Sequence, residues 1–215
     1  MPPSNPPPPA LGSDEDFPAP PRQARSQAAR QKLLDAGRRE FAAQGFQAAS
    51  IVAISARAGT ATGAFYLYFR SKRQLLLVLM NEFLRRLHGL DLRPQVRGGI
   101  AASLRKFLQA AFRADREYYG VVRAWQEAAL TDAGLGRMQA QIEAWTNARV
   151  RGVFRMLAQH PDARQDLDLT AFARMMDRHF WSILARGVSL SPRDFNREVG
   201  IAADVIYHYI FRDLE

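Results

Sequence analysis

The residues best suited to chemistry lie between Ser50 and Lys72, in the stretch SIVAISARAGTATGAFYLYFRSK. Hydroxyl, phenol and ammonium groups recur there among small apolar residues, and such groups hydrogen-bond to phosphate oxygens and base edges. Ser50 can cap one short helix, Gly59 can supply a turn, and a second short helix can follow it. Two short helices joined by a tight turn are typical of the helix-turn-helix, whose second helix enters the major groove of DNA. The stretch therefore predicts binding to double-stranded DNA.

The charge distribution supports a polyanionic partner for this segment. The chain has 30 Lys and Arg against 21 Asp and Glu. Residues 22–73 hold 10 basic and two acidic residues, whereas residues 74–215 hold 20 basic and 16 acidic ones, and residues 1–21 hold only three acids. Such asymmetry is typical of a surface that docks on nucleic acid. A basic surface without a partner is the alternative that charge alone leaves open.

The predicted reading face lacks the side chains that make the strongest base contacts. Residues 59–69 contain no Arg, Lys, Asn or Gln, so bidentate contacts to guanine and adenine are excluded there. We expect contacts to thymine methyls and single acceptors instead, made by Thr62, Gly63 and Ala64. Arg22 and Arg25, in the arm before the first helix, would add readout of DNA shape.

The same segment resembles the tetracycline-repressor-like (TetR) family of bacterial regulators, whose signature is roughly A-G-V-S-x-G-x-x-Y-x-Y-F-x-S-K-x-x-L. Nine residues match this signature in order, namely Ala58, Gly59, Gly63, Tyr66, Tyr68, Phe69, Ser71, Lys72 and Leu75. With Gly45-Phe46 and the Ile51-x-x-Ile54 pair upstream, the resemblance covers about residues 30–76. The chain departs at Thr60-Ala61, where the family has Val-Ser, so Thr60 or Thr62 would supply the missing hydroxyl.

The resemblance implies phosphate contacts from Lys72 and from the hydroxyls of Tyr66 and Tyr68. By chemistry alone Lys72 could be a solvated lysine, and Tyr68 could belong to the core around Phe65 and Phe69. Leu67 is expected to be exposed unless a sugar or a methyl group covers it. The whole predicted DNA-binding set is Arg22, Arg25, Ser50, Thr60, Thr62, Gly63, Ala64, Tyr66, Leu67, Tyr68 and Lys72.

Apolar residues recur at three and four positions almost throughout, which predicts an all-α fold of about nine helices without strands. The first helix is expected over about residues 26–44, with Gly45 as its stop. Residues 1–23 contain most of the prolines and predict a disordered tail. Residues 24–72 would form the helix-turn-helix domain. The resemblance implies that residues 73–215 form a helical effector-binding and dimerisation domain.

Two broad apolar stripes near the C-terminus, over residues 172–184 and 201–210, suit the dimer interface that the resemblance implies for the last two helices. Packing within one chain is the alternative. The candidate interface residues are Phe172, Met176, Phe180, Ile183, Ala202, Val205, Ile206 and Tyr209. The resemblance also implies an effector pocket among the middle helices. The aromatic and apolar residues there favour an apolar or aromatic molecule, although such residues also suit a plain core. Its candidates are Phe83, Phe112, Tyr119, Arg123, Trp125, Met138, Trp145 and His179.

Several function classes find no support. The chain has no Cys, and its four His are not spaced as metal ligands, so no metal or cofactor is expected. No hydrolase, P-loop, zincin or dinucleotide signature occurs, which argues against an enzyme. The longest apolar run spans six residues, against about 20 for a membrane span, and no export signal is visible, so a cytoplasmic protein is expected. We predict a homodimeric repressor released from an inverted-repeat operator by a small effector; the alternative is a helical module that binds acidic proteins.

Overall fold

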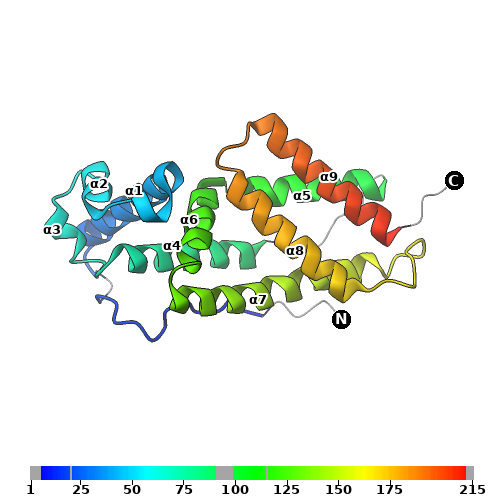
Figure 1. The fold of residues 1–215 in the computed structure, drawn as a ribbon, viewed down its shortest axis with the longest axis horizontal. Helices are drawn as coiled ribbons and strands as arrows, with labels where there is room; N and C mark the ends of the chain where they lie inside the picture. The colour runs from blue at the N-terminus through cyan, green and yellow to red at the C-terminus, as the bar shows by residue number, and fades with distance from the viewer. Residues whose placement is uncertain (1–5, 20, 91–98, 115, 212–215) are drawn as a thin grey trace. The chain divides into compact units, whose positions relative to one another are not determined.

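The computed structural model describes residues 6–19, 21–90, 99–114 and 116–211, and in these residues it contains helices, one isolated β-bridge between Ala163 and Phe211, and no strand (Figure 1). This confirms the predicted all-α fold. The α-helices are α1 (Ala24–Ala48), α2 (Ile51–Arg57), α3 (Thr62–Phe65), α4 (Lys72–Gly89), α5 (Ile100–Ala114), α6 (Tyr119–Ala129), α7 (Ala133–Leu157), α8 (Leu169–Arg186) and α9 (Pro192–Ile210). A short 3-10 helix covers Arg116–Tyr118.

The chain divides into two compact units. The first comprises Pro9–Arg86 and Glu117–Gln139, and the second comprises the other described residues, chiefly Leu87–Arg116 and those from Ala140 onward. The sequence suggests a boundary at residues 72/73 instead. The structure keeps most of α4 together with α1–α3, and adds α6 to them, because α6 packs along α1.

Helix α1 carries the predicted apolar stripe, since Leu33, Leu34 and Phe41 are buried. Gly45 interrupts the helix as predicted, with φ 76° and ψ −173°, but the chain then resumes a helical course as far as Ala48. Where α6 packs against α1, Gly120 of α6 is buried, and a Cβ on it would lie 2.4 Å from the Cα of Ala42 in α1. Only glycine allows this approach of the two helices.

Residues 6–19 differ from the disordered tail that the composition predicts for residues 1–23; residues 1–5 and 20 lie outside the described ones. Leu11 is buried, and its backbone N–H and C=O are both hydrogen-bonded by the Asn81 side chain on α4. A count of prolines and aromatic residues does not register the buried Leu11 or its two hydrogen bonds to Asn81, which together hold this segment on α4.

The second unit contains α5, α8 and α9. Asp168 caps α8 by accepting from the Thr170 and Ala171 amides. Helix α9 begins at a capped turn: the Ser191 hydroxyl oxygen accepts from the Asp194 amide, and Pro192 takes the first helical position. Among the described residues, no helix joins the length to the apolar character that crossing a membrane requires, and His, Asp and Glu form no group suited to a metal ion.

One ionisable group lies in the core of this second unit. Asp177 of α8 is buried, and its Oδ2 accepts from the Thr146 hydroxyl at 2.9 Å. The Trp181 indole Nε1 donates to the same hydroxyl oxygen at 3.3 Å. Burial raises the pKa of Asp177 to about 7, and nearby Glu143 raises it too, while the Thr146 bond and Arg178 oppose the shift. The carboxyl therefore takes up a proton in the neutral range.

Stability is expected to depend on pH through Asp177. Because the folded-state pKa lies above the ordinary value, the folded state binds the proton more tightly, and stability falls as pH rises toward 7 and levels off above it. From pH 8 to pH 6 the free energy of unfolding should gain about 1.4 kcal/mol from this group. Urea unfolding across this range checks it against Asp177→Asn, which should lose that gain. Equal pH dependence in both proteins would contradict the assignment.

Candidate nucleic-acid interface

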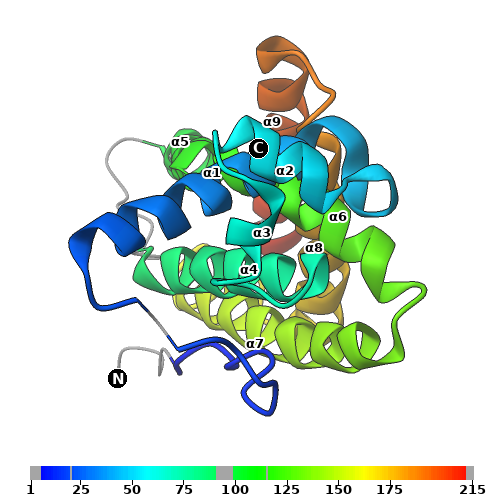
Figure 2. The ribbon, with the colours of Figure 1, turned by 90° about the vertical axis from the view of Figure 1, so that its left-hand side faces the viewer.

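Helices α2 and α3 form the helix-turn-helix at one end of the first unit, and Figure 2 looks onto them with α4 beside α3. The Ser50 Oγ accepts from the Ala53 amide at 3.1 Å, so Ser50 caps α2 as predicted. Gly59 makes the turn with φ 68°, and the Thr60 amide donates to the Ser55 carbonyl at 3.0 Å. A positive φ of this size strains any residue with a Cβ, which explains a glycine at the turn.

Aromatic packing fixes α3 on its inner side. Phe65 and Phe69 are fully buried, with their ring centroids 5.5 Å apart, and Ile54 of α2 is fully buried as well. The Arg30 guanidinium lies over the Phe69 ring at 5.4 Å. A helix of only four residues has little stability of its own, so this packing holds it in place.

The outer side of α3, in which we include the turn that follows it at residues 66–68, is bare, that is, exposed to solvent. Tyr66 is 53% exposed and Leu67 is 68% exposed, which agrees with the exposed position expected for Leu67. Gly63 is exposed, and a Cβ there would meet nothing within 4 Å. Thr62, Ala64 and Tyr68 are partly exposed. Val52 of α2, which the sequence did not single out, is 65% exposed and adds to the exposed apolar surface of the motif.

Neither threonine caps α3 in place of the missing serine. The N-cap position belongs to Ala61, which makes no side-chain cap bond, and Thr62 already lies inside the helix. The Thr60 hydroxyl donates to the Ala61 carbonyl at 3.5 Å instead. The hydroxyl of Thr60 or Thr62 therefore does not replace the serine as a cap, because each lies one residue away from the capping position. A phosphate contact, the other role of the missing hydroxyl, stays a prediction.

Lys72 has a role that the sequence did not reveal. Its Nζ donates to the carbonyl oxygens of Phe46, Gln47 and Ala49 at 2.7, 3.2 and 2.8 Å, and lies 4.6 Å from the Phe46 ring centroid. Burial lowers the pKa of Lys72, and nearby Glu127 opposes this shift. The three N–H groups are thus used on the end of α1, and a phosphate would have to displace one of these carbonyls. Lys72 is not the freely solvated lysine that chemistry alone left open.

A carboxylate of α6 binds the same segment, residues 45–49 at the end of α1, which we call the corner. It binds backbone amides there, whereas Lys72 binds backbone carbonyls. Glu127 accepts from the Phe46 amide at 2.7 Å and from the Gln47 amide at 3.0 Å. A Cβ on Gly45 would lie 2.5 Å from the Glu127 Oε2, so the glycine also makes room for this carboxylate. Arg123, one turn earlier on α6, donates to the Ala42 carbonyl at 2.9 Å. Helix α6 therefore grips the part of α1 that leads into the motif.

The two predicted arm residues differ in position. Arg22 precedes α1 and is exposed, as an arm residue should be. Arg25 is also exposed but lies in the first turn of α1, because the helix begins at Ala24 rather than at about residue 26. A helical side chain has less reach than an arm, so only Arg22 keeps the position that shape readout requires.

The predicted effector residues fall in both units. Phe83, Tyr119, Arg123, Trp125 and Met138 belong to the first unit, and Phe112, Trp145 and His179 belong to the second. Several have polar atoms already engaged: the Trp125 Nε1 donates to Gln139 at 2.7 Å, and the Trp145 Nε1 donates to the Pro6 carbonyl at 2.9 Å. Phe83, Tyr119 and Trp125 are buried, as either core or pocket residues would be.

Most of the predicted dimer residues pack inside a single chain, which is the alternative that the sequence left open. The residues buried within one chain are Phe172, Met176, Ile183, Ala202 and Ile206. Val205 is 42% exposed, and so are two neighbours that the sequence missed, Met175 at 53% and Ile201 at 51%. Periodicity in the sequence identifies an apolar stripe, but it does not show which residues of the stripe are buried within the chain and which remain exposed to solvent.

These exposed residues line a groove on α8 and α9 with a volume of about 700 Å³. Phe172 and Tyr209 stack in it with ring centroids 3.8 Å apart. His208, Asp204 and Arg164 supply polar groups along its border. The groove is open and mostly apolar, so this face of the second unit combines an aromatic floor with exposed aliphatic side chains.

Comparison with known proteins agrees with this geometry. Residues 33–79 match the family model of bacterial regulatory proteins, tetR family, which confirms the resemblance found at about residues 30–76. None of the curated proteins matches the sequence. The match covers most of α1, the whole of α2 and α3 and the first part of α4, and so includes the bare face of α3.

Solved structures show the same fold over most of the chain. The repressor SmeT of the Stenotrophomonas maltophilia multidrug efflux pump SmeDEF is 22% identical with a TM-score of 0.63, over 88% of this chain and 93% of SmeT. A SmeT–triclosan complex is 23% identical with a TM-score of 0.66, over 87% and 94%. Salmonella enterica GusR is 19% identical with a TM-score of 0.62, over 84% and 95%.

Proposed function

We propose that the protein is a sequence-specific transcriptional repressor that acts as a homodimer, because residues 33–79 match the family model of bacterial regulatory proteins, tetR family. The observation that carries the proposal is the bare outer side of α3. Tyr66 and Leu67 are exposed there, although Phe65 and Phe69 on the inner side are fully buried. A short helix fixed by its core and open on its other side suits insertion into the major groove.

Recognition of DNA bases by the outer side of α3 would depend on small side chains. Thr62, Gly63 and Ala64 can approach base edges closely, and Leu67 can cover a thymine methyl or a sugar. The hydroxyls of Tyr66 and Tyr68, the capping residue Ser50, and Thr60 would contact phosphates and fix the register. One helix-turn-helix would bind DNA weakly, so two copies held at a fixed spacing on an inverted repeat would supply the affinity. On this basis we place the protein in the cytoplasm, where the chromosome is.

The dimer would form through the open face of α8 and α9. Met175 of α8 and Ile201 and Val205 of α9 are exposed and line the aromatic groove. Exposed apolar patches of this kind mark interaction sites, and a twofold interface would pair each patch with its copy. A dimer joined there would hold two copies of the motif in one particle.

Val205→Glu is expected to convert the dimer into a monomer, because two carboxylates would be buried at the twofold interface without partners. Sedimentation velocity at micromolar protein measures this directly. Leu130→Glu is the matched control, since Leu130 is 87% exposed and belongs to the first unit rather than to α8 or α9, so its replacement should leave the dimer intact. A Val205→Glu protein that still sediments as a dimer would contradict this interface.

We propose that an apolar or aromatic effector releases the repressor from DNA. The coupling would run through α6, which carries the pocket candidates Tyr119 and Trp125 and grips α1 through Arg123 and Glu127. An effector that prefers the conformation without DNA must weaken operator binding by the same coupling factor, typically ~1–3 kcal/mol. Triclosan is bound in the SmeT complex, and it is a reasonable first compound to screen here.

Affinity selection from a random duplex pool at ~0.15 M salt, followed by sequencing, tests the function. We expect enrichment of an inverted repeat with half-sites about one helical turn apart. Binding without enrichment that fades as salt rises would overturn the sequence-specific repressor. In that case the protein-interaction module, using its basic surface on acidic partners, becomes the better account.

A further inference from the structure

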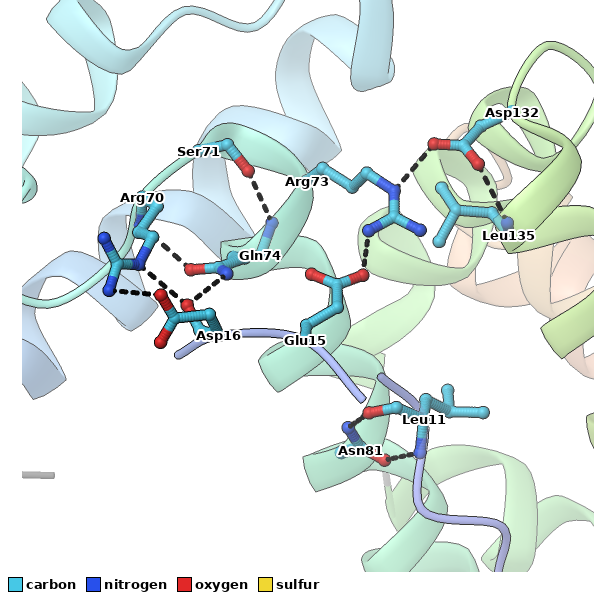
Figure 3. Close-up of polar contacts among 10 residues, drawn as sticks. All are labelled: Leu11, Glu15, Asp16, Arg70, Ser71, Arg73, Gln74, Asn81, Asp132 and Leu135. Carbon is cyan, nitrogen blue, oxygen red and sulfur yellow. Dashed lines mark hydrogen bonds and ion pairs between the residues drawn. The ribbon is translucent and has the colours of Figure 1, made fainter. Parts of the chain in front are cut away.

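We propose that residues 11–16 form an acidic strap that occupies Arg70 as a DNA phosphate would, and thereby limits DNA binding (Figure 3). The inference rests on the proposed function, because it concerns a further DNA contact of the same motif. It adds Arg70 to the DNA-binding residues and makes the N-terminal segment a competitor for it.

Arg70 occupies a position where phosphates are expected. It lies two residues after the exposed turn that contains Tyr66, Leu67 and Tyr68, and it precedes Lys72 by two residues. Its side chain is more than half exposed. A guanidinium can hold a phosphate through two parallel N–H bonds, which an ammonium does not do.

The strap is fastened to α4 by more than charge. The Leu11 amide donates to Asn81 Oδ1 at 3.0 Å, and Asn81 Nδ2 donates to the Leu11 carbonyl at 2.9 Å. Gly12 turns the chain with φ 68°, and a Cβ on it would lie 3.1 Å from the Leu77 Cδ1. The Glu15 amide closes the turn by donating to the Gly12 carbonyl at 3.0 Å. This turn directs Glu15 and Asp16 along α4 toward its first residues.

Asp16 holds Arg70 at two points. Its Oδ2 lies 2.6 Å from the Arg70 Nη2, and its carbonyl oxygen accepts from the Arg70 Nε at 2.8 Å. Gln74 donates to the same carbonyl at 3.1 Å and accepts from the Arg70 amide at 3.0 Å. One acidic residue thus offers the guanidinium a carboxylate oxygen and a carbonyl oxygen side by side, much as a phosphate offers two oxygens.

Comparison with the neighbouring Arg73–Glu15 ion pair shows that Asp16 is the carboxylate that a phosphate can replace. Arg73 is bound by Glu15 and also by Asp132, whose Oδ2 lies 2.6 Å from the Arg73 Nε. The Leu135 amide bonds to that carboxylate as well, and although burial opposes the shift, these bonds hold the pKa of Asp132 below its ordinary value. Arg73 is therefore shared by two carboxylates and partly shielded, whereas Arg70 and Asp16 are both solvent-exposed. A phosphate would displace Asp16 far more readily than it would displace Glu15.

Charge complementarity supports the strap as the occupant. Residues 1–21 contain three acids and no base, and residues 22–73 contain 10 bases and two acids. Two of the three acids, Glu15 and Asp16, pair with arginines of the motif's flank, whereas Asp14 is exposed and no polar contact of its side chain is found among the described residues. Asp14 therefore offers a matched control for the loss of one negative charge.

The test compares full-length Asp16→Asn and Asp14→Asn proteins on one labelled duplex of random sequence and on the duplex enriched from the pool, by fluorescence anisotropy at ~0.15 M salt. Asp16→Asn should bind two- to fivefold more tightly than Asp14→Asn, since an exposed ion pair competes only weakly with DNA. In an Arg70→Gln background the two aspartate variants should bind equally, because the masked group is gone.

Equal affinities of the two single variants, or weaker binding by Asp16→Asn, would overturn the strap while leaving the DNA-binding function in place. A difference that persists in the Arg70→Gln background would also overturn it, because Arg70 would not be the masked group. If wild-type protein and all variants bind neither duplex, the proposed function fails, and the strap fails with it.

Discussion

Replacing Lys72 by methionine is expected to lower the free energy of unfolding by about 2 kcal/mol, even without DNA. The ammonium group donates to three carbonyl oxygens at the end of α1, and methionine would leave these carbonyls without a donor. The methionine side chain would still fill the space of the alkyl chain, so most of the loss would come from the hydrogen bonds. A lysine that only contacts phosphates would leave unfolding of the free protein unchanged.

Urea unfolding of the free protein measures this effect, and Lys32→Met is the matched control. Lys32 is exposed on α1 in the same unit, and its replacement removes the same charge. We expect Lys32→Met to unfold within about 0.5 kcal/mol of wild type. If Lys72→Met were equally stable, the three carbonyl bonds would not hold the corner, and the phosphate contact implied by the resemblance would become its main role.

Local signals in the sequence predict local structure well in this chain. Ser50 and Gly59 act through neighbours within a few residues, and each takes the predicted position. The aromatic pair Phe65 and Phe69 shares one face at helical spacing and is buried as expected. These features need no knowledge of the rest of the fold, because capping and turn chemistry are set by adjacent residues.

Contacts between distant residues explain what the sequence did not reveal. Glu127 bonds to amides about 80 residues earlier, and Asn81 bonds to Leu11 across 70 residues. Neither pair follows a motif, and a single Glu or Asn carries no signal of its partner. The dimer stripe shows a different limit, since Met176 and Met175 are adjacent in sequence but only one of them is exposed.

The corner formed by Gly45, Lys72 and Glu127 suggests how an effector signal would reach DNA. At the end of α1, the Glu127 carboxylate from α6 binds backbone amides, and the Lys72 ammonium from α4 binds backbone carbonyls. A shift of α6 would change the first set of bonds without breaking the second. The reading helix would then tilt rather than unfold, as a reversible switch between two DNA affinities requires.

Binding of Leu67→Glu and Leu130→Glu proteins to the duplex enriched from the random pool would show whether the outer side of α3 contacts DNA. Both leucines are exposed, at 68% and 87%, and both variants gain one negative charge. Because Leu67 lies on the bare side of α3, its replacement should weaken binding about 10- to 100-fold through lost contact and repulsion of the phosphates. Leu130→Glu should bind within about twofold of wild type. Equal binding by the two variants would contradict an interface on the outer side of α3.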